Sequence, residues 1–159
     1  MIQVGERLPK ATFTVMTADG PKPKTTDEVF AGKKVVLFSV PGAFTPTCDR
    51  NHLPSFRDKA AELKAKGVDA IACTAANDVF VMNAWAKASN AADSIEFLAD
   101  GSATFAKAVG LSLDLTERGM GMRSKRYSMI VDNGVLTKLN IEENPGIELS
   151  GADNILKQL

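Results

Sequence analysis

The chain of 159 residues contains only two cysteines and one histidine. The cysteines, Cys48 and Cys73, lie 25 positions apart, and two are too few for the disulfide framework of a small secreted domain. There is no C-x-x-C pair, and His52 is the lone imidazole, so the sequence offers no ligand set for a structural zinc site. We therefore expect neither a disulfide scaffold nor a bound metal.

A surplus of charge of either sign is also missing. Lysine and arginine number 19, as do aspartate and glutamate, so the formal net charge is zero. Such a chain has no strongly basic surface to attract nucleic acids or anionic membranes, and neither is an expected partner. No apolar run approaches the roughly 18 residues of a membrane-spanning helix. The N-terminal segment MIQVGERLPK lacks the apolar region of a signal peptide, which predicts a cytoplasmic location.

The composition is that of a soluble globular protein, with 45% hydrophobic and 24% charged residues. No internal repeat, low-complexity tract or linker interrupts the chain. Residues 1–159 are therefore predicted to form a single domain that is large enough to bury a core of its own.

Six segments have the patterns of β-strands. Residues 34–40 form a continuous apolar run, which is typical of a strand buried on both faces. Residues 11–16 alternate and indicate an edge strand, which ends at the turn residues 19–21. The Asp-Asn-Gly sequence at 132–134 is a hairpin signal. The predicted strands are residues 11–16, 34–40, 68–74, 95–98, 127–131 and 135–141.

Helical patterns lie between these strands. In residues 51–66 the apolar positions Leu53, Phe56, Ala60 and Leu63 recur at spacings of 3, 4 and 3, which places them on one face. The predicted helices are residues 26–32, 51–66, 78–87, 102–109 and 150–159. Strands that alternate with helices, followed by a hairpin and a last helix, predict an α/β fold. We expect a thioredoxin-like fold: a central mixed β-sheet flanked by helices, with an N-terminal β extension.

Cys48 follows the buried strand 34–40 directly and stands at the start of an amphipathic helix. Ligands and chemistry gather at this position in open α/β sheets. The first turn of a helix presents unpaired N–H groups and about half a positive charge, which stabilise a thiolate relative to a thiol. The thiolate is the nucleophilic form. The alternative is that Cys48 is a small buried hydrophobic residue, as most free cysteines are.

The neighbours of Cys48 favour the reactive interpretation. Pro41, Thr45 and Cys48 have the spacing P-x-x-x-T-x-x-C. The Thr45 hydroxyl, three residues before the cysteine on the same tight turn, can reach both the sulfur and a substrate oxygen. Pro41 is rigid and has no N–H, so it can shield one side of the sulfur without offering a competing donor.

The segment PGAFTPTC closely resembles the peroxidatic-cysteine motif of the peroxiredoxins, in particular of their type II, atypical subfamily. The resemblance covers nearly the whole chain, through NHLPSF, ELKAKGVD, CTAANDVFVMNAW, FLADGSATF and GMRSKRYSMIVDNGV. It implies a thioredoxin-like fold and a thiol peroxidase that needs no cofactor. In such enzymes the cysteine thiolate, here Cys48, attacks the O–O bond of a hydroperoxide. The cysteine becomes a sulfenic acid, and water or an alcohol is released.

The resemblance also implies a cation beside the sulfur, supplied by an arginine just before a late strand. Arg126 directly precedes Tyr127, Ser128 and Met129, as the family arginine does, and is the candidate. A guanidinium stays charged and its planar donors can serve sulfur and oxygen acceptors together. Arg123 and Lys125 are interpreted as a solvated basic turn.

The remaining candidates surround the motif. His52 lies four residues after Cys48, and a Cys–His pair resembles that of a thiol protease. We favour a supporting role, in packing or in a hydrogen bond that orients the active-site turn, because no Asn or Asp partner is evident. Phe44 and Pro46, with Thr47 beside them, are expected to line an apolar collar that binds the substrate.

The reductant is the most open question. Cys73 ends the strand 68–74 and is interpreted as a core cysteine, with a resolving role as the alternative. Some atypical relatives carry a resolving cysteine near the C-terminus, where GIELSGADN has none. This departure favours an external thiol, from glutathione and glutaredoxin or from thioredoxin. The resemblance further implies a homodimer. A peroxide sensor that oxidises a partner protein and a non-enzymatic thioredoxin-like interaction module are the alternative functions.

Overall fold

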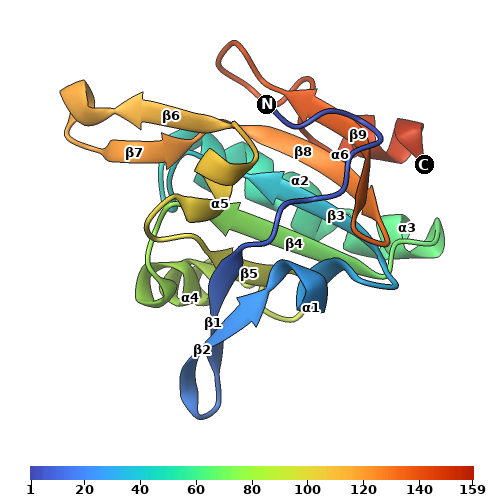
Figure 1. Cartoon of the computed structure of the whole chain (residues 1–159), viewed down its shortest axis with the longest axis horizontal. Helices are drawn as coiled ribbons and strands as arrows, with labels where there is room; N and C mark the ends of the chain where they lie inside the picture. The colour runs from blue at the N-terminus through green and yellow to red at the C-terminus, as the bar shows by residue number, and fades with distance from the viewer.

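A seven-stranded mixed sheet forms the centre of the computed structural model, which describes residues 1–159 (Figure 1). The strands run in the order β2-β1-β5-β4-β3-β8-β9. Their bounds are β1 (Thr12–Thr17), β2 (Gly20–Thr25), β3 (Lys34–Ser39), β4 (Ala70–Ala75), β5 (Glu96–Ala99), β8 (Tyr127–Asp132) and β9 (Val135–Ile141). The mixed sheet predicted from the alternation of elements is confirmed.

The strands β3, β4 and β5 are parallel, and β1 and β8 run antiparallel to their neighbours in this group. The register pairs Ser39 at the end of β3 with Tyr127 at the start of β8 on one side and with Thr74 of β4 on the other. Val35 to Ser39 are buried, as expected for a strand covered on both faces. The carboxyl end of β3 therefore meets the amino end of β8 at one edge of the sheet.

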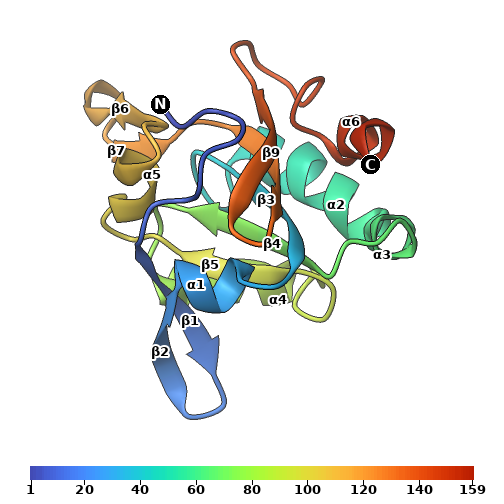
Figure 2. The ribbon, with the colours of Figure 1, turned by 45° about the vertical axis from the view of Figure 1, so that its right-hand side comes forward.

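Helices cover both faces of the sheet (Figure 2). Helices α2, α3, α4 and α6 pack on one face, where Leu53, Leu63, Met82 and Ile155 join one core cluster. Helices α1 and α5 pack on the other face together with the N-terminal segment. The bounds are α1 (Thr26–Phe30), α2 (Leu53–Asp58), α3 (Ala60–Ala65), α4 (Val79–Ala88), α5 (Thr104–Ala108) and α6 (Ala152–Gln158).

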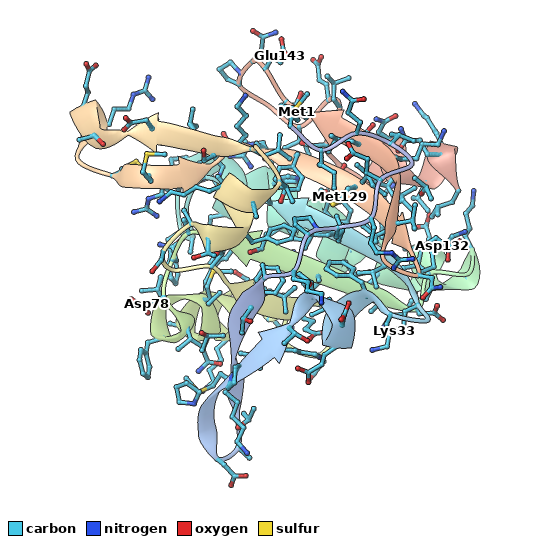
Figure 3. All side chains as sticks on the ribbon, viewed as in Figure 1. Met1, Lys33, Asp78, Met129, Asp132 and Glu143 are labelled. Carbon is cyan, nitrogen blue, oxygen red and sulfur yellow. The ribbon has the colours of Figure 1, made fainter.

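The hairpin predicted at 132–134 joins β8 to β9. Asn133 and Gly134 both have positive φ angles, 49° and 79°, which is the conformation that a two-residue hairpin turn requires. Figure 3 shows Asp132 and Lys33 together at this end of the sheet, while Glu143, beyond the end of β9, lies far from them. The motif at residues 41–48 belongs to the end near Glu143, because it follows the carboxyl end of β3.

The edge assignment of residues 11–16 is wrong. Strand β1 is paired on both sides, with β2 and β5, and β2 is the edge. The sequence of β2, GPKPKT, contains two prolines. Prolines are tolerated on an edge strand, but they break the residue pattern by which a strand is predicted from sequence. The short strands β6 (Ser112–Leu115) and β7 (Gly121–Ser124), which form a second sheet, were not predicted either.

The helix predicted at 51–66 consists of three pieces. A π-helical turn, η1 (Cys48–His52), is followed by α2, and a break at Lys59 separates α2 from α3. The four apolar positions of the predicted face are all buried, so the periodicity identified the correct face. The longest helix, α4, has ten residues, and no helix combines the length and hydrophobicity that a membrane crossing requires.

Two methionines that differ in burial allow a test of which side chains form the core. Met82 of α4 is 1% exposed, and Met122 of β7 is 39% exposed. Met82→Ala removes buried side-chain atoms and leaves a cavity, so it should lower the free energy of unfolding by about 2–5 kcal/mol. Met122→Ala should change it by less than about 0.5 kcal/mol. Urea unfolding measures both, and equal losses would contradict the assigned burial.

Candidate active site

The chain turns sharply after β3, through residues 41–45. The Thr45 hydroxyl donates to the carbonyl of Gly42 at 2.6 Å, and the Asn77 side chain accepts from the Ala43 N–H at 2.9 Å. Phe44 adopts a positive φ of 65°, which is uncommon for an aromatic residue and costs energy that these hydrogen bonds offset. The turn is thus fixed from both sides before the helical residues begin at Pro46.

Cys48 occupies the first helical turn, as predicted, and its side chain is fully buried. The turn from Cys48 to His52 is π-helical, so the N–H of Leu53 donates to the Cys48 carbonyl. A π-helical turn holds one more residue in its hydrogen-bonded ring than an α-helical turn, and such turns are frequent at functional sites. The widened turn changes where the side chain of His52 points relative to the sulfur.

Arg126 reaches the sulfur directly. Its Nη2 donates to Cys48 Sγ at 2.8 Å, although 78 positions separate the two residues. The sheet register explains the approach, because Tyr127 pairs with Ser39 and so places Arg126 beside the end of β3, opposite the turn. A guanidinium at this distance stabilises the charged thiolate over the neutral thiol.

His52 holds the other half of the guanidinium. Arg126 Nη1 donates to His52 Nδ1 at 2.9 Å, and His52 Nε2 lies 2.9 Å from the carbonyl oxygen of Ser150. Burial first, and then the positive charge of Arg126, lower the pKa of His52 from 6.5 to about 3. The ring is therefore neutral at pH 7. It accepts from Arg126 at Nδ1 and donates to Ser150 from Nε2–H, which selects one tautomer.

This geometry fits a supporting position for His52 and not that of a protease base. The ring contacts Arg126 and packs beside Phe38 and Phe56, with ring centroids 5.0 and 5.7 Å away. A base whose pKa is near 3 has little tendency to take a proton from a thiol at pH 7.

The predicted collar residues lie on the surface side of the turn. Phe44 is 49% exposed and Pro46 is exposed, whereas Thr47 is half-buried. The ring of Phe44 faces Trp85 of α4 at 6.4 Å, and the Trp85 indole N–H donates to Asp49 beside Cys48 at 2.9 Å.

Pro41 and Arg126 also line a cavity of about 380 Å³, which opens beside the turn. The other lining residues come from β6, the link between β7 and β8, the end of β9 and the segment after it, and include Leu113, Lys125 and Glu143.

The prediction that Arg123 belongs to a solvated turn is wrong, because Arg123 lies in β7 and is half-buried. Its Nε donates to the Met120 carbonyl at 2.8 Å, and the side chain folds against the active-site turn. A methyl group added at Gly42 would lie 3.5 Å from Arg123 Nη1 and 3.1 Å from Thr45 Cγ2. Sequence reasoning missed this contact because it depends on the β6–β7 hairpin. Ser150, which fixes His52, was missed because nothing in its local sequence marks it.

Cys73 is a buried residue of β4, in the same core cluster as Cys48, and both cysteines are free. Burial raises the pKa of Cys73 well above its ordinary value, with a smaller contribution from the charge of Cys48. Cys73 is thus held as the thiol, whereas the sulfur of Cys48, which is equally buried, accepts a hydrogen bond from Arg126. No three His, Cys, Asp or Glu side chains lie together as a metal site would require.

Comparison with known proteins gives a consistent picture. The Redoxin family model matches residues 3–156. Peroxiredoxin-2C of Oryza sativa subsp. japonica is 55% identical over 129 residues, which cover 81% of this chain and 80% of the relative. Peroxiredoxin-2B of Arabidopsis thaliana is 44% identical and is covered to 98%, with 99% of this chain. This chain belongs to the type II peroxiredoxins.

The solved structures agree with this assignment. Reduced Prx3 from Vibrio vulnificus in complex with hydrogen peroxide is 52% identical to this peroxiredoxin, with a TM-score of 0.95 and 99% coverage of both chains. The predicted thioredoxin-like fold is thereby confirmed. As a peroxiredoxin, the chain is a thiol-dependent peroxidase, as the motif at 41–48 implied.

The lowered pKa of His52 predicts an acid-sensitive fold. Below about pH 6.5 the unfolded chain binds a proton at His52 that the folded peroxiredoxin does not bind until the pH nears 3. The free energy of unfolding therefore contains a contribution from the neutral His52 ring. It is fully present above pH 6.5 and falls by up to about 1.4 kcal/mol per pH unit below pH 6.5. Urea unfolding near pH 7 and near pH 5 should show a smaller loss for His52→Gln than for the wild type. Identical losses would contradict the buried neutral ring.

Proposed function

We propose that Cys48 is the peroxidatic cysteine of this peroxidase and that Arg126 is the cation that activates it. The observation that carries the proposal is the contact of 2.8 Å between Arg126 Nη2 and Cys48 Sγ. Arg126 faces a neutral imidazole on its other side, so its positive charge is available to the sulfur. The placement of Cys48 in the first helical turn adds the dipoles of unpaired N–H groups.

The reaction begins with attack by the Cys48 thiolate on one oxygen of a hydroperoxide. The S–O bond forms as the O–O bond breaks, and the electron pair moves to the leaving oxygen, which takes up a proton and departs as water or an alcohol. Cys48 becomes a sulfenic acid. Arg126 stabilises both the thiolate and the negative charge that grows on the leaving oxygen. Hydrogen peroxide as a substrate is supported by the related Vibrio vulnificus structure, which was solved with it.

Thr45 and Pro41 complete the proposed site. The Thr45 hydroxyl donates its hydrogen to Gly42, so its lone pairs can accept a hydrogen bond from the O–H of the peroxide. Pro41 presents no N–H, and Phe44, Pro46 and Thr47 form the outer side of the turn. An apolar rim of this kind accommodates the organic part of small organic hydroperoxides.

The sulfenic acid is resolved by a thiol from outside the chain. Cys73 is a poor resolving residue because burial raises its pKa, so it stays a thiol and does not form the nucleophilic thiolate. Residues 146–154 contain no cysteine. The incoming thiol condenses with the sulfenic acid, which forms a mixed disulfide and releases water, and a second thiol then restores Cys48. We favour glutathione with glutaredoxin as the reductant, with thioredoxin as the alternative.

The domain boundaries and the cellular location of the enzyme are also part of the proposal. The central sheet contains both the first strand, β1, and the last strand, β9, and the family match spans residues 3–156. Both observations support a single domain over residues 1–159. The cytoplasmic location stays a prediction from the sequence, since two relatives of similar identity are named as chloroplastic.

Removal of the Arg126 charge tests the activation. Arg126→Gln should move the pH profile of Cys48 alkylation to higher pH and slow peroxide consumption by about 100-fold, by analogy with the loss of one oxyanion-hole donor. Lys125→Gln, which changes the neighbouring charge, should leave both unchanged. Superimposable alkylation curves for Arg126→Gln and the wild type would refute the assignment.

Intact-mass measurement tests the resolving step. One equivalent of peroxide in the presence of glutathione should give one glutathione adduct per chain, which is absent in Cys48→Ser and retained in Cys73→Ser. A glutaredoxin should remove the adduct and sustain turnover. A wild-type mass that falls by two hydrogens, without an adduct, would instead establish a Cys48–Cys73 disulfide. A single oxidation without turnover would favour the sensor.

The proposed homodimer rests on exposed aromatic residues near the active-site turn. Phe44 and Phe80 are 49% and 65% exposed, which is costly for large apolar side chains unless a partner covers them. Light scattering at micromolar concentration should give about twice the chain mass of 17.0 kDa. Phe80→Asp should give the mass of a single chain. A wild-type monomer with full activity would remove the dimer.

A further inference from the structure

The carboxylate of Glu142, just beyond the end of β9, holds a segment that the proposed chemistry does not explain. It accepts hydrogen bonds from the Leu149 N–H at 3.1 Å, the Ser150 N–H at 2.9 Å and the Ser150 hydroxyl at 2.7 Å. Charge-assisted hydrogen bonds of this kind are stronger than neutral ones. Both donors of Ser150 are thereby satisfied by a single side chain.

The same residue also holds the backbone of Arg126. The Glu142 N–H donates to the Arg126 carbonyl at 2.9 Å. Its main chain therefore fixes the residue that contacts the sulfur, while its side chain fixes Ser150, whose carbonyl accepts from His52. Glu142 is therefore connected to Arg126 in two ways. Its N–H bonds the Arg126 carbonyl, and its carboxylate reaches the guanidinium through Ser150 and His52, which accepts from Arg126 Nη1.

The position of the Ser150 carbonyl decides the tautomer of His52. With the carbonyl in place, Nε2 carries the hydrogen and Nδ1 is free to accept from Arg126. If the carbonyl moved away, the N–H of Arg126 alone would favour a hydrogen on Nε2, and the preference for that tautomer would weaken. A hydrogen on Nδ1 would face the N–H of Arg126, and the guanidinium would turn from the sulfur.

Ser150 is fully buried, and the Glu142 carboxylate is the acceptor for both of its hydrogen-bond donors. Its neighbour Leu149 is 50% exposed and so is not anchored by the core. The next residues are held separately, because Gly151 donates to the Ile147 carbonyl and Ala152 donates to the Ser55 hydroxyl. Ser150 itself has two polar partners: its N–H and hydroxyl donate to Glu142, and its carbonyl accepts from His52.

We propose that Glu142 is a positioning residue for Cys48: by fixing the Ser150 carbonyl, it keeps His52 in the tautomer that aims Arg126 at the sulfur. The inference rests on the proposed roles of Cys48 and Arg126. It assigns to the segment 142–150 the task of holding the arginine in place.

The single histidine of the chain allows a direct test. In protein labelled with ¹⁵N-histidine, the ring nitrogen shifts of His52 report which nitrogen carries the hydrogen. The wild type should show hydrogen on Nε2 alone, and Glu142→Ala should show a mixture. Glu142→Gln, which keeps an acceptor oxygen, should lie between them. Glu148→Gln, an exposed change in the same segment, should match the wild type.

The same variants should differ in chemistry. Glu142→Ala should slow the oxidation of Cys48 by peroxide by about tenfold and move its alkylation profile to higher pH, because a small misplacement of a catalytic group is costly. Glu142→Gln should recover part of the rate. A merely structural role would lower the unfolding midpoint without changing the tautomer or the alkylation profile.

A folded Glu142→Ala with the wild-type tautomer and alkylation profile would overturn the proposal. A changed tautomer with an unchanged alkylation profile would also overturn it, while Cys48→Ser and Arg126→Gln test the proposed peroxidase site independently. If Glu142→Ala does not fold, the same two measurements on Glu142→Gln decide the outcome.

Discussion

The contact between Arg126 and Cys48 is the interaction on which the proposed site depends. A thiolate that is shielded from water is costly unless a cation and hydrogen-bond donors replace the lost hydration. Arg126 supplies the positive charge and a hydrogen-bond donor at 2.8 Å from the sulfur. Its other N–H groups need acceptors that do not carry a negative charge. A carboxylate beside it would neutralise the guanidinium. The neutral imidazole of His52 accepts a hydrogen bond and leaves the charge for the sulfur.

The architecture of the sheet creates this contact. The antiparallel pairing of β3 with β8 brings Arg126 to the edge where the active-site turn begins, and the π-helical turn from Cys48 to His52 lets both side chains meet the same guanidinium. Strand β9 then returns to that edge and delivers Glu142 beside the Arg126 carbonyl. Three segments that are distant in sequence thus converge on one sulfur.

The two cysteines differ in chemistry although they share a core cluster. Cys48 is buried, but its sulfur faces a cation, whereas burial raises the pKa of Cys73 and keeps it a thiol. Residues 146–154, which contain no cysteine, have a different part in the structure. That segment is held through Ser150 by Glu142, so we assign it to the support of the arginine and not to a resolving disulfide.

Local sequence determined the fold class, the buried face of the helix after Cys48, the hairpin at 132–134 and the place of Cys48 in a first helical turn. These features follow from short-range periodicity and turn chemistry, which are written in neighbouring residues. The motif resemblance pointed to Arg126. Only the tertiary structure revealed the edge strand β2, the β6–β7 hairpin, the fold of Arg123 against the turn, and the hydrogen bonds from Arg126 through His52 to Ser150 and Glu142. These depend on strand register and on contacts across many residues, such as the 98 positions between His52 and Ser150, and no local pattern encodes them.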